Sequence, residues 1–408
     1  MKIAMMTNNY KPFVAGVPIS IERLTISLRM LGHQVVVFAP TYKDQKEEED
    51  IVRYRSLLQG VACGFSVPNC IDPVIERRFK EGDFDVIHVH HPMMMGRTAA
   101  YLSDKYEVPL VFTYHTRYEQ YMHYVGLSAL KGILPAYIKN YSKHCDGLIA
   151  PTPMMKQYLE KIRVNAPVYV LPTGLESHCF QPEDRRVQEI RSTLLKDRKY
   201  LFCTVARLAK EKNLPFLFRS LKLVKESMEV KGKKPDFRLA VIGKGPEEKQ
   251  LRELSGRLGM DEEIVFVGEV PNKEVKNYCA ASDLFLFASQ SETQGIVLIE
   301  AMAVGTPVLA LKGTGTEDIV FSGKNGYMVD SLEWEFAAKL MDILDKKEIE
   351  ILQKGALETA ESYRCDIIAK EAVQIYRKAM WLHQEKPTIE MYMRENSNGT
   401  IQNFNCRG

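Results

Sequence analysis

The sequence predicts an α/β fold with two doubly wound domains, each built on a mostly parallel sheet. Three observations support this class. The chain has 408 residues, more than one ordinary hydrophobic core holds. Short apolar runs alternate with amphipathic stretches of helical length, which is the pattern of βα units. The alternation also restarts after the charged, loop-like segment 172–186, so each half is expected to form its own sheet.

The first half opens with a βαβ unit. Residues 2–7 read as a strand, 16–31 as a helix that ends at Gly32, and 34–40 as a fully buried strand. Further strands are predicted at 86–90, 110–114, 148–150 and 168–171. The first turn lacks GxGxxG, so the signature of an NAD site is absent. Its loop glycine, Gly16, stands at a helix start and can admit a phosphate, although an ordinary turn glycine is an equal alternative.

The second half repeats this alternation and is followed by a terminal helix. Strands are predicted at 200–206, 237–242, 264–267, 284–288 and 308–311, and helices at 213–230, 246–258 and 272–280. The predicted organisation is a first domain at 1–175, a second at 176–365, a helix at 366–386 and a polar, loosely ordered tail at 387–408.

Composition limits the class of protein. With 45% hydrophobic and 26% charged residues, the chain is typical of soluble globular proteins. It has no apolar run of 18 residues and no apolar signal-peptide core at its start, so a cytoplasmic protein without a spanning helix is expected. The eight cysteines form no CxxC pair, and strand alternation separates His91 from His88 and His90, so no metal or cofactor is expected.

The stretch 289–310, SQSETQGIVLIEAMAVGTPVLA, carries the strongest functional signal. A short buried helix follows a loop, and glutamates stand in both, at Glu292 and Glu300. Acceptors at these positions and amide donors at Thr293, Gln294, Gly295 and Ile296 suit a ligand with hydroxyls and phosphates, such as a nucleotide sugar. Taken singly, Glu292 is better explained as a solvated loop acid and Glu300 as an acid paired with a neighbouring Lys or Arg; the combination favours the ligand.

Other candidates stand where predicted strands end, since the ligand crevice of a parallel sheet lies there. Arg207 and Lys212 follow the strand 200–206 and suit a diphosphate. His115 follows the strand 110–114. Residues 118–143 interleave aromatic and basic side chains, as an interfacial membrane contact requires, although a core helix pair broken at Pro135 explains them too. The candidate membrane or acceptor residues are Tyr118, Tyr121, Tyr124, Lys131 and Lys139.

Together these residues resemble the retaining glycosyltransferases of the GT-B fold, in the group 1 or family 4 type. The similarity covers about residues 1–385 and rests on Gly16, His115, ARLAKEKN and ETQGIVLIEAMAVGTPVLA. It implies two Rossmann-like domains facing a central cleft, with the terminal helix returning to the first. It also implies that Glu292 and the amides after it hold the donor sugar, Glu300 the ribose, and Arg207 and Lys212 the diphosphate. His115 is expected near the donor sugar, and no metal is expected.

Within this family the segments PFVAGVPISIERL, HTRYEQYMHY and SETQGIVLIEAMA look most like bacterial diacylglycerol glucosyltransferases. The resemblance implies transfer of glucose, or galactose, from UDP to a lipid hydroxyl at an anionic membrane, with retention by a front-face mechanism. Nucleic acid is not an expected partner. The chain departs from the family at Ala15, Thr173 and Glu176, where many members have Gly, Asn and Asp. Alternatives are a soluble acceptor with the same donor chemistry, or a nucleotide-sugar 2-epimerase.

Overall fold

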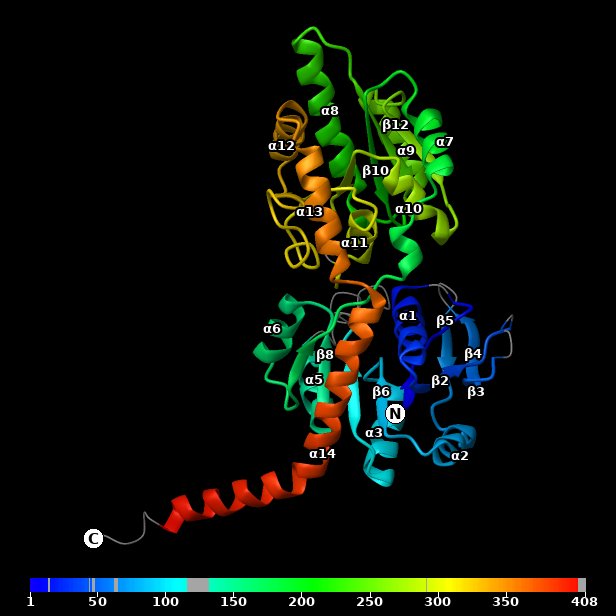
Figure 1. Cartoon of the computed structure of the whole chain (residues 1–408), viewed down its shortest axis with the longest axis vertical. Coiled ribbons are helices and arrows are strands. Elements are labelled where there is room, and N and C mark those ends of the chain that lie inside the picture. The colour runs from blue at the N-terminus through cyan, green and yellow to red at the C-terminus, as the bar shows by residue number, and fades with distance from the viewer. Residues whose placement is uncertain are drawn as a thin grey trace, which may run out of the picture. The chain divides into compact units, whose positions relative to one another are not determined.

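The computed structural model describes residues 1–13, 15–43, 45, 48–61, 65–115, 132–290 and 292–402. Its contacts divide the chain into two compact units, coloured along the sequence in Figure 1. Unit 1 comprises Met1–Leu171 and Ile368–Gly408, and unit 2 comprises Pro172–Ile367. The sequence-based boundaries stand a few residues away, at 175 and 365. The chain therefore leaves unit 1 once and returns to it in its last helix.

Unit 1 is built on a seven-stranded parallel sheet in the order β3-β2-β1-β6-β7-β8-β9. Its strands are β1 (Lys2–Met6), β2 (Gln34–Pro40), β3 (Ile51–Tyr54), β6 (Val86–Val89), β7 (Leu110–Thr113), β8 (Gly147–Ala150) and β9 (Val168–Val170). Two further strands, β4 (Ser56–Val61) and β5 (Phe65–Pro68), pair as a separate antiparallel ribbon. The sequence pattern did not predict β3 to β5. The strand order reverses direction between β1 and β6, which places a topological switch point there.

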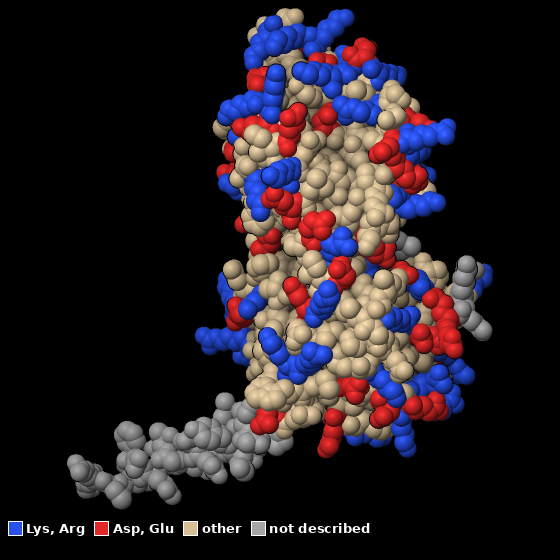
Figure 2. Space-filling model, viewed as in Figure 1, with Lys and Arg blue, Asp and Glu red and all other residues tan. Residues whose placement is uncertain are grey.

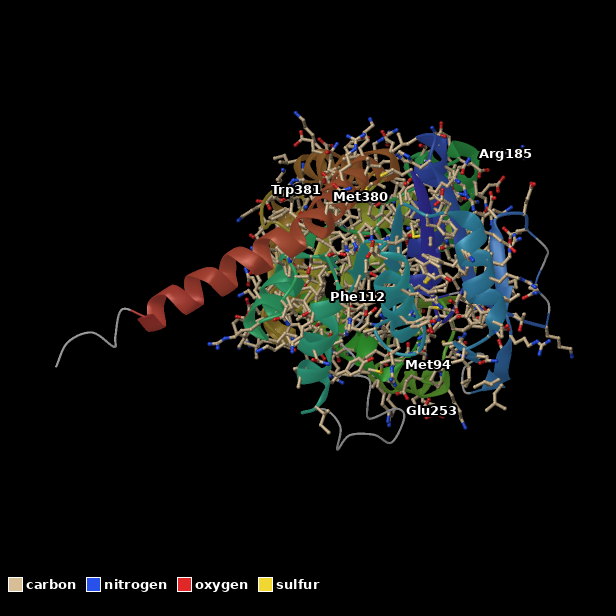
Figure 3. The ribbon with its side chains drawn as sticks, turned by 90° about the horizontal axis from the view of Figure 1, so that it is seen from below. Met94, Phe112, Arg185, Glu253, Met380 and Trp381 are labelled. Atoms are coloured by element: carbon tan, nitrogen blue, oxygen red, sulfur yellow. The ribbon has the colours of Figure 1, made fainter. Side chains whose placement is uncertain are left out.

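Helices cover both faces of this sheet because its strands are apolar on both sides. The helices of unit 1 are α1 (Gly16–Met30), α2 (Pro73–Gly82), α3 (Met95–Tyr106), α5 (Leu134–Tyr141), α6 (Pro153–Lys161) and α14 (Cys365–Gln402), with a 3₁₀ turn η4 (Ser142–His144). Ala4 and Met6 of β1 pack in the core that α2, α3, α5 and α6 share, whereas Met5 packs with α1 and α14. In Figure 3, Phe112 of β7 lies inside the unit and Trp381 of α14 at its edge, 58% exposed.

Unit 2 contains a six-stranded parallel sheet in the order β12-β11-β10-β13-β14-β15. Its strands are β10 (Tyr200–Val205), β11 (Phe237–Ile242), β12 (Ile264–Gly268), β13 (Leu284–Phe287), β14 (Val308–Leu311) and β15 (Gly326–Val329). The order reverses between β10 and β13, so the loops after these two strands flank the switch point. The two predicted doubly wound sheets are thus confirmed.

Helices also cover both faces of the unit 2 sheet. They are α7 (Asp184–Leu195), α8 (Leu214–Val230), α9 (Glu248–Leu258), α10 (Asn272–Ala280), α11 (Ile296–Met302), α12 (Glu333–Asp345) and α13 (Ile349–Glu361), with 3₁₀ turns η5 (Ser177–Phe180) and η6 (Lys210–Lys212). Helices α8, α9 and α12 share one core, and α7, α10 and α11 share the other. The buried side chains Leu298, Ile299, Ala301 and Met302 confirm that α11 lies in the interior.

Helix α14 corrects the expectation of a polar, loosely ordered tail from residue 387. The helix continues to Gln402. The segment contains several strong helix formers among its polar residues, and these favour continuation. Pro387 lies inside the helix, where a proline removes one backbone donor and bends the axis. Figure 1 shows α14 changing direction in its C-terminal part.

Candidate functional site

The loops that follow β10, β11, β13 and β14 meet at one edge of the unit 2 sheet, because parallel strands place all their carboxyl ends together. Direct hydrogen bonds join these loops in pairs. The Leu208 N–H donates to the Lys244 carbonyl (3.0 Å), and the Ser289 hydroxyl donates to the Glu211 carbonyl (3.1 Å). The Thr314 hydroxyl donates to the carbonyl of Gln290 (3.1 Å). The four loops therefore form one connected polar platform.

An ion pair between Lys212 and Glu292 is the central contact of this platform. The Lys212 Nζ lies 2.5 Å from the Glu292 Oε1, and 22% and 21% of the two side chains are exposed. The residues come from η6 after β10 and from the loop after β13. Both were sequence-based candidates, and the structure brings them together. Solvent screens the two charges of a sheltered pair less than those of a fully exposed pair. The attraction between Lys212 and Glu292 is therefore stronger and holds the two side chains together.

The second predicted cation, Arg207, bonds to an acid that the sequence analysis did not single out. Its Nη2 donates to the Glu211 Oε1 at 2.6 Å, and 58% of the Arg207 side chain is exposed. Burial raises the pKa of Glu211, but its hydrogen bond from Arg207 and the nearby charge of Lys212 outweigh burial, so the pKa is lowered overall. Glu211 thus remains an anion beside both cations. Its i, i+4 spacing from Arg207 was the available sequence signal.

Four glycines allow the platform loops to approach backbone to backbone. A Cβ on Gly243 would stand 2.0 Å from the Ala206 carbonyl oxygen, and one on Gly245 would stand 2.3 Å from that of Leu208. On the other side of the switch point, a Cβ on Gly313 would lie 2.8 Å from the Gln290 Cα, and one on Gly315 would lie 2.7 Å from the Glu292 Cβ. In the sequence these glycines stand in the segments GKGP and KGTGT, directly after predicted strands, where glycine indicates a tight loop.

The Gln294 side chain binds the backbone of Thr173. Its Oε1 accepts from the Thr173 N–H at 2.8 Å and its Nε2 donates to the Thr173 carbonyl at 3.2 Å, with only 5% of Gln294 exposed. This two-bond contact fixes the segment PTGLES, which begins unit 2, against the loop after β13. The side chain of Gln294 therefore links two loops of unit 2. Only its backbone amide stays a candidate for donor binding.

The remaining predicted donor residues surround the start of α11. Gly295 caps the helix in the left-handed region at φ 69°, where glycine is favoured, and Ile296 is the first helical residue. Thr293 and Ile296 are half-buried. Glu300, also half-buried, is the fifth residue of α11 and stands about 6 Å further along the axis than Ile296. Its charge contributes to the raised pKa of Cys279, after the hydrogen bond between Cys279 and Cys203 and after burial.

The other two candidates, Gly16 and His115, belong to unit 1. Gly16 is the first residue of α1, is exposed, and a Cβ there would meet no atom within 4 Å. Local packing therefore does not require glycine at this position. His115 follows β7, and its Nε2 lies 2.8 Å from the Nδ1 of His90. Burial and the neighbouring histidines hold the pKa of His115 well below its usual value.

The predicted membrane or acceptor surface is described only in part, since Tyr118, Tyr121, Tyr124 and Lys131 lie outside the described residues. Within α5, Lys139 is exposed. The apolar side chains of that helix turn inward instead: Leu134, Ile138 and Tyr141 are buried. In this short described part, the buried apolar residues fit the core interpretation, while Ala136, Lys139 and Asn140 are exposed. Figure 2 shows Lys and Arg interspersed with Asp and Glu on the drawn face of both units.

Comparison with known proteins identifies the family. Residues 14–178 match the model of Glycosyltransferase Family 4, and residues 186–357 match that of Glycosyl transferases group 1. The chain is 31% identical over 326 residues to an alpha-monoglucosyldiacylglycerol synthase of Streptococcus pneumoniae, covering 76% of this chain and 71% of the relative. The chain belongs to the group 1/family 4 glycosyltransferases.

Of two further relatives of this glycosyltransferase, one shares the named activity of the Streptococcus pneumoniae protein and the other does not. An alpha-monoglucosyldiacylglycerol synthase of Acholeplasma laidlawii is 28% identical, with 92% of this chain and 96% of the relative covered. A GDP-mannose-dependent alpha-mannosyltransferase of Corynebacterium glutamicum is 25% identical, with 95% and 91% covered. Among solved structures, HepE of Anabaena in complex with UDP has a TM-score of 0.72 at 17% identity, with 92% of this chain and 99% of HepE covered. The fold is GT-B, as the motifs predicted.

The close approach of Gly315 to Glu292 generates a prediction for this glycosyltransferase. Gly315→Ala places a Cβ against Glu292 at a backbone φ of 81°, which strains the loop and displaces the carboxylate. We expect a loss of about 1–3 kcal/mol in unfolding free energy and a clear fall in nucleoside diphosphate release. Gly232→Ala is the matched control, because its φ is 66° and no atom lies within 4 Å. Equal turnover in the two variants would contradict the assigned role of the loop contact.

Proposed function

We propose that this glycosyltransferase moves a hexose, with glucose favoured, from a UDP-sugar to the hydroxyl of a membrane lipid such as diacylglycerol. The sheltered Lys212–Glu292 pair at the edge of the unit 2 sheet is the observation that carries the donor half of this proposal. The named activities of the Streptococcus pneumoniae and Acholeplasma laidlawii relatives support the acceptor half. The enzyme would then work at the cytoplasmic face of the cell membrane as a peripheral protein.

The donor chemistry follows from the groups on the platform. An ammonium has three N–H donors, and Glu292 accepts from one of them, so Lys212 can also donate to a diphosphate oxygen. Arg207 offers a planar fork suited to the same anion. A carboxylate accepts several hydrogen bonds, so Glu292 can hold Lys212 and still accept from sugar hydroxyls. Glu300 is assigned to the ribose hydroxyls, and the amides of Thr293 to Ile296 to the donor sugar.

The proposed reaction exchanges one bond at the anomeric carbon. The bond from this carbon to the diphosphate oxygen breaks, and a bond to the acceptor oxygen forms on the same face. The acceptor hydroxyl gives its proton to the departing diphosphate, which leaves as UDP. Lys212 and Arg207 stabilise the negative charge that develops on the leaving group, and this electrostatic support lowers the barrier. The scheme gives retention of configuration and needs no metal or cofactor.

Product analysis tests donor and acceptor together. Purified enzyme is incubated with UDP-glucose and mixed micelles of diacylglycerol and anionic lipid, and lipids and nucleotides are separated. We expect UDP and a monoglycosyl lipid in equal amounts, with the α-anomer identified by NMR. UDP release without a glycolipid would overturn the proposal of a lipid acceptor. Soluble hydroxyl compounds would then be tested, such as the inositol phosphate named for one relative. Turnover with GDP-mannose alone would overturn the donor, and a free isomerised sugar would indicate a 2-epimerase.

Replacing the carboxylate of the central ion pair tests its role in turnover. Glu292→Gln keeps the shape and removes the charge that faces Lys212, so we expect kcat/KM to fall by about 10²-fold or more, with folding retained. The control is Glu333→Gln, which breaks another ion pair of unit 2, with Arg219, outside the platform. Circular dichroism and thermal unfolding verify that both variants fold. A Glu292→Gln enzyme with wild-type turnover would remove this residue from the mechanism.

The exposed basic residues near α5 generate a prediction about membranes. Lys139 and Lys143 are exposed, and each basic residue near an anionic surface contributes about 1 kcal/mol to binding. We therefore expect vesicles containing phosphatidylglycerol to bind the enzyme, high salt to release it, and the double change to glutamate to weaken binding by about tenfold or more. Lys233→Glu together with Lys234→Glu, in an exposed loop of unit 2, is the control. Equal vesicle binding by the two double variants would exclude Lys139 and Lys143 from the contact.

A further inference from the structure

A row of hydrogen-bonded side chains links His115 to the interior of unit 1. The Nε2 of His115 lies 2.8 Å from the Nδ1 of His90, and the two rings are stacked with centroids 5.1 Å apart. On its other side, the His90 Nε2 lies 3.3 Å from the sulfur of Met5. Only 1% of His90 and none of Met5 is exposed, so packing holds this geometry on three adjacent strands or their ends.

The sulfur fixes the proton on His90. A thioether sulfur accepts hydrogen bonds weakly and donates none, so the ring atom that faces it carries the N–H. His90 is neutral, because burial disfavours its charged form and the titratable groups whose charges act on it are His88, His115 and His91, none of them an acid. A neutral imidazole has one N–H. The His90 Nδ1 is therefore an acceptor.

This assignment determines the state of His115. Because the His90 Nδ1 can only accept, the contact between the two rings requires the His115 Nε2 to donate. The Nδ1 of His115 then has a lone pair and no proton. Among the described residues it has no hydrogen-bond partner, whereas both ring nitrogens of His88 are occupied, by Tyr376 and Thr113. We infer that His90 is a positioning residue that holds His115 in the Nε2–H tautomer, so that the His115 Nδ1 accepts a hydrogen bond from a substrate hydroxyl.

The tautomer decides which chemical group His115 can recognise. A neutral ring with its lone pair at Nδ1 accepts from the hydroxyl of a sugar or an alcohol. It cannot donate to a phosphate or to a carbonyl through that atom. The assignment to a transferase substrate rests on the proposed function, but the tautomer itself follows from unit 1 alone. Its partner is thus a hydroxyl of the hexose or of the acceptor, and the phosphate groups are left to the cations of unit 2.

Direct observation of the ring nitrogens tests the tautomer without any assay of turnover. The full-length protein is labelled with ¹⁵N-histidine, and two-bond ¹H–¹⁵N correlations assign each ring, with the His115 signals identified as those lost in His115→Gln. We expect His115 and His90 to be neutral at pH 7, His115 with its proton on Nε2 and His90 with its proton on Nε2. A proton on the His115 Nδ1, or an imidazolium at either residue, would overturn the proposal.

Variants of the two supporting residues test the positioning role. His90→Gln can offer an amide oxygen to His115 and is expected to keep kcat/KM within about threefold of wild type, while His90→Leu offers no acceptor and is expected to lower it by about ten- to a hundredfold. In His90→Leu the His115 signals should show a mixture of tautomers. Met5→Leu conserves volume, removes the sulfur and should release the fixed proton position on His90.

The control for these variants is Phe112→Leu, which disturbs the buried core of β7 on the opposite sheet face without touching either histidine. If it lowers turnover as much as His90→Leu, or if His90→Leu keeps one His115 tautomer, the positioning role is overturned. Should His90→Leu not fold, the wild-type and Met5→Leu spectra still decide the proposal. A fixed Nε2–H tautomer in a protein that releases no UDP would refute the proposed function and leave the positioning of His115 by His90 intact.

Discussion

Parallel pairing of β10 with β13 is the constraint on which the candidate site depends. The register aligns Phe202 with Leu284 and Cys203 with Phe285, so the loops that follow the two strands emerge side by side. Lys212 and Glu292 are 80 residues apart in the chain, yet this pairing brings their charged atoms into contact. An insertion of another strand between β10 and β13 would separate them by a further strand spacing of about 4.8 Å. The strand order of the sheet therefore decides whether these residues can meet at all.

The sheltering of the Lys212–Glu292 pair sets how it responds to change. A fully exposed pair contributes about 0–1 kcal/mol, and the loss of one partner from a buried pair leaves an uncompensated charge that costs about 3–5 kcal/mol. With about a fifth of each side chain exposed, this pair lies between those limits. A phosphate that takes up part of the Lys212 charge would leave the Glu292 carboxylate more available to hydroxyls. Under the proposed function, the ion pair would thus couple the two halves of a nucleotide-sugar ligand.

The sequence revealed most of the sheet architecture but only part of the platform. Strands such as β2 and β11 are buried on both faces, and their continuous apolar runs are visible without a structure. Arg207, Lys212 and Glu292 could be placed because strand ends define the ligand edge. The side-chain role of Gln294 could not be predicted, since its partner Thr173 is 121 residues away and bonds through its backbone. Backbone partners leave no complementary residue type for a sequence pattern to show.

The glycines and histidines also show which features the sequence reveals and which require the structure. Gly315 and Gly243 are recognisable as loop glycines after strands, but the atoms that they admit become known only once the neighbouring loops are placed. The HVHH run raised a question about metals, whereas the structure uses its members as separate neutral hydrogen-bonding groups. Burial lowers the pKa of His88 to about 3 and that of His91 to about 4, far enough that neither carries a charge near neutral pH.

The two sheet edges consequently have different electrostatic characters. At the edge of unit 2, cations and carboxylates lie in direct ion pairs while still reaching solvent. At the corresponding edge of unit 1, burial disfavours the charged form of His90. The titratable groups that act on it are histidines, so no acid among them balances a proton. A charged group attracts a phosphate from any direction, whereas a neutral ring acts only through the orientation of one donor and one acceptor. Recognition at unit 1 therefore depends on which ring nitrogen carries the proton, and this depends on packing around Met5 and His90.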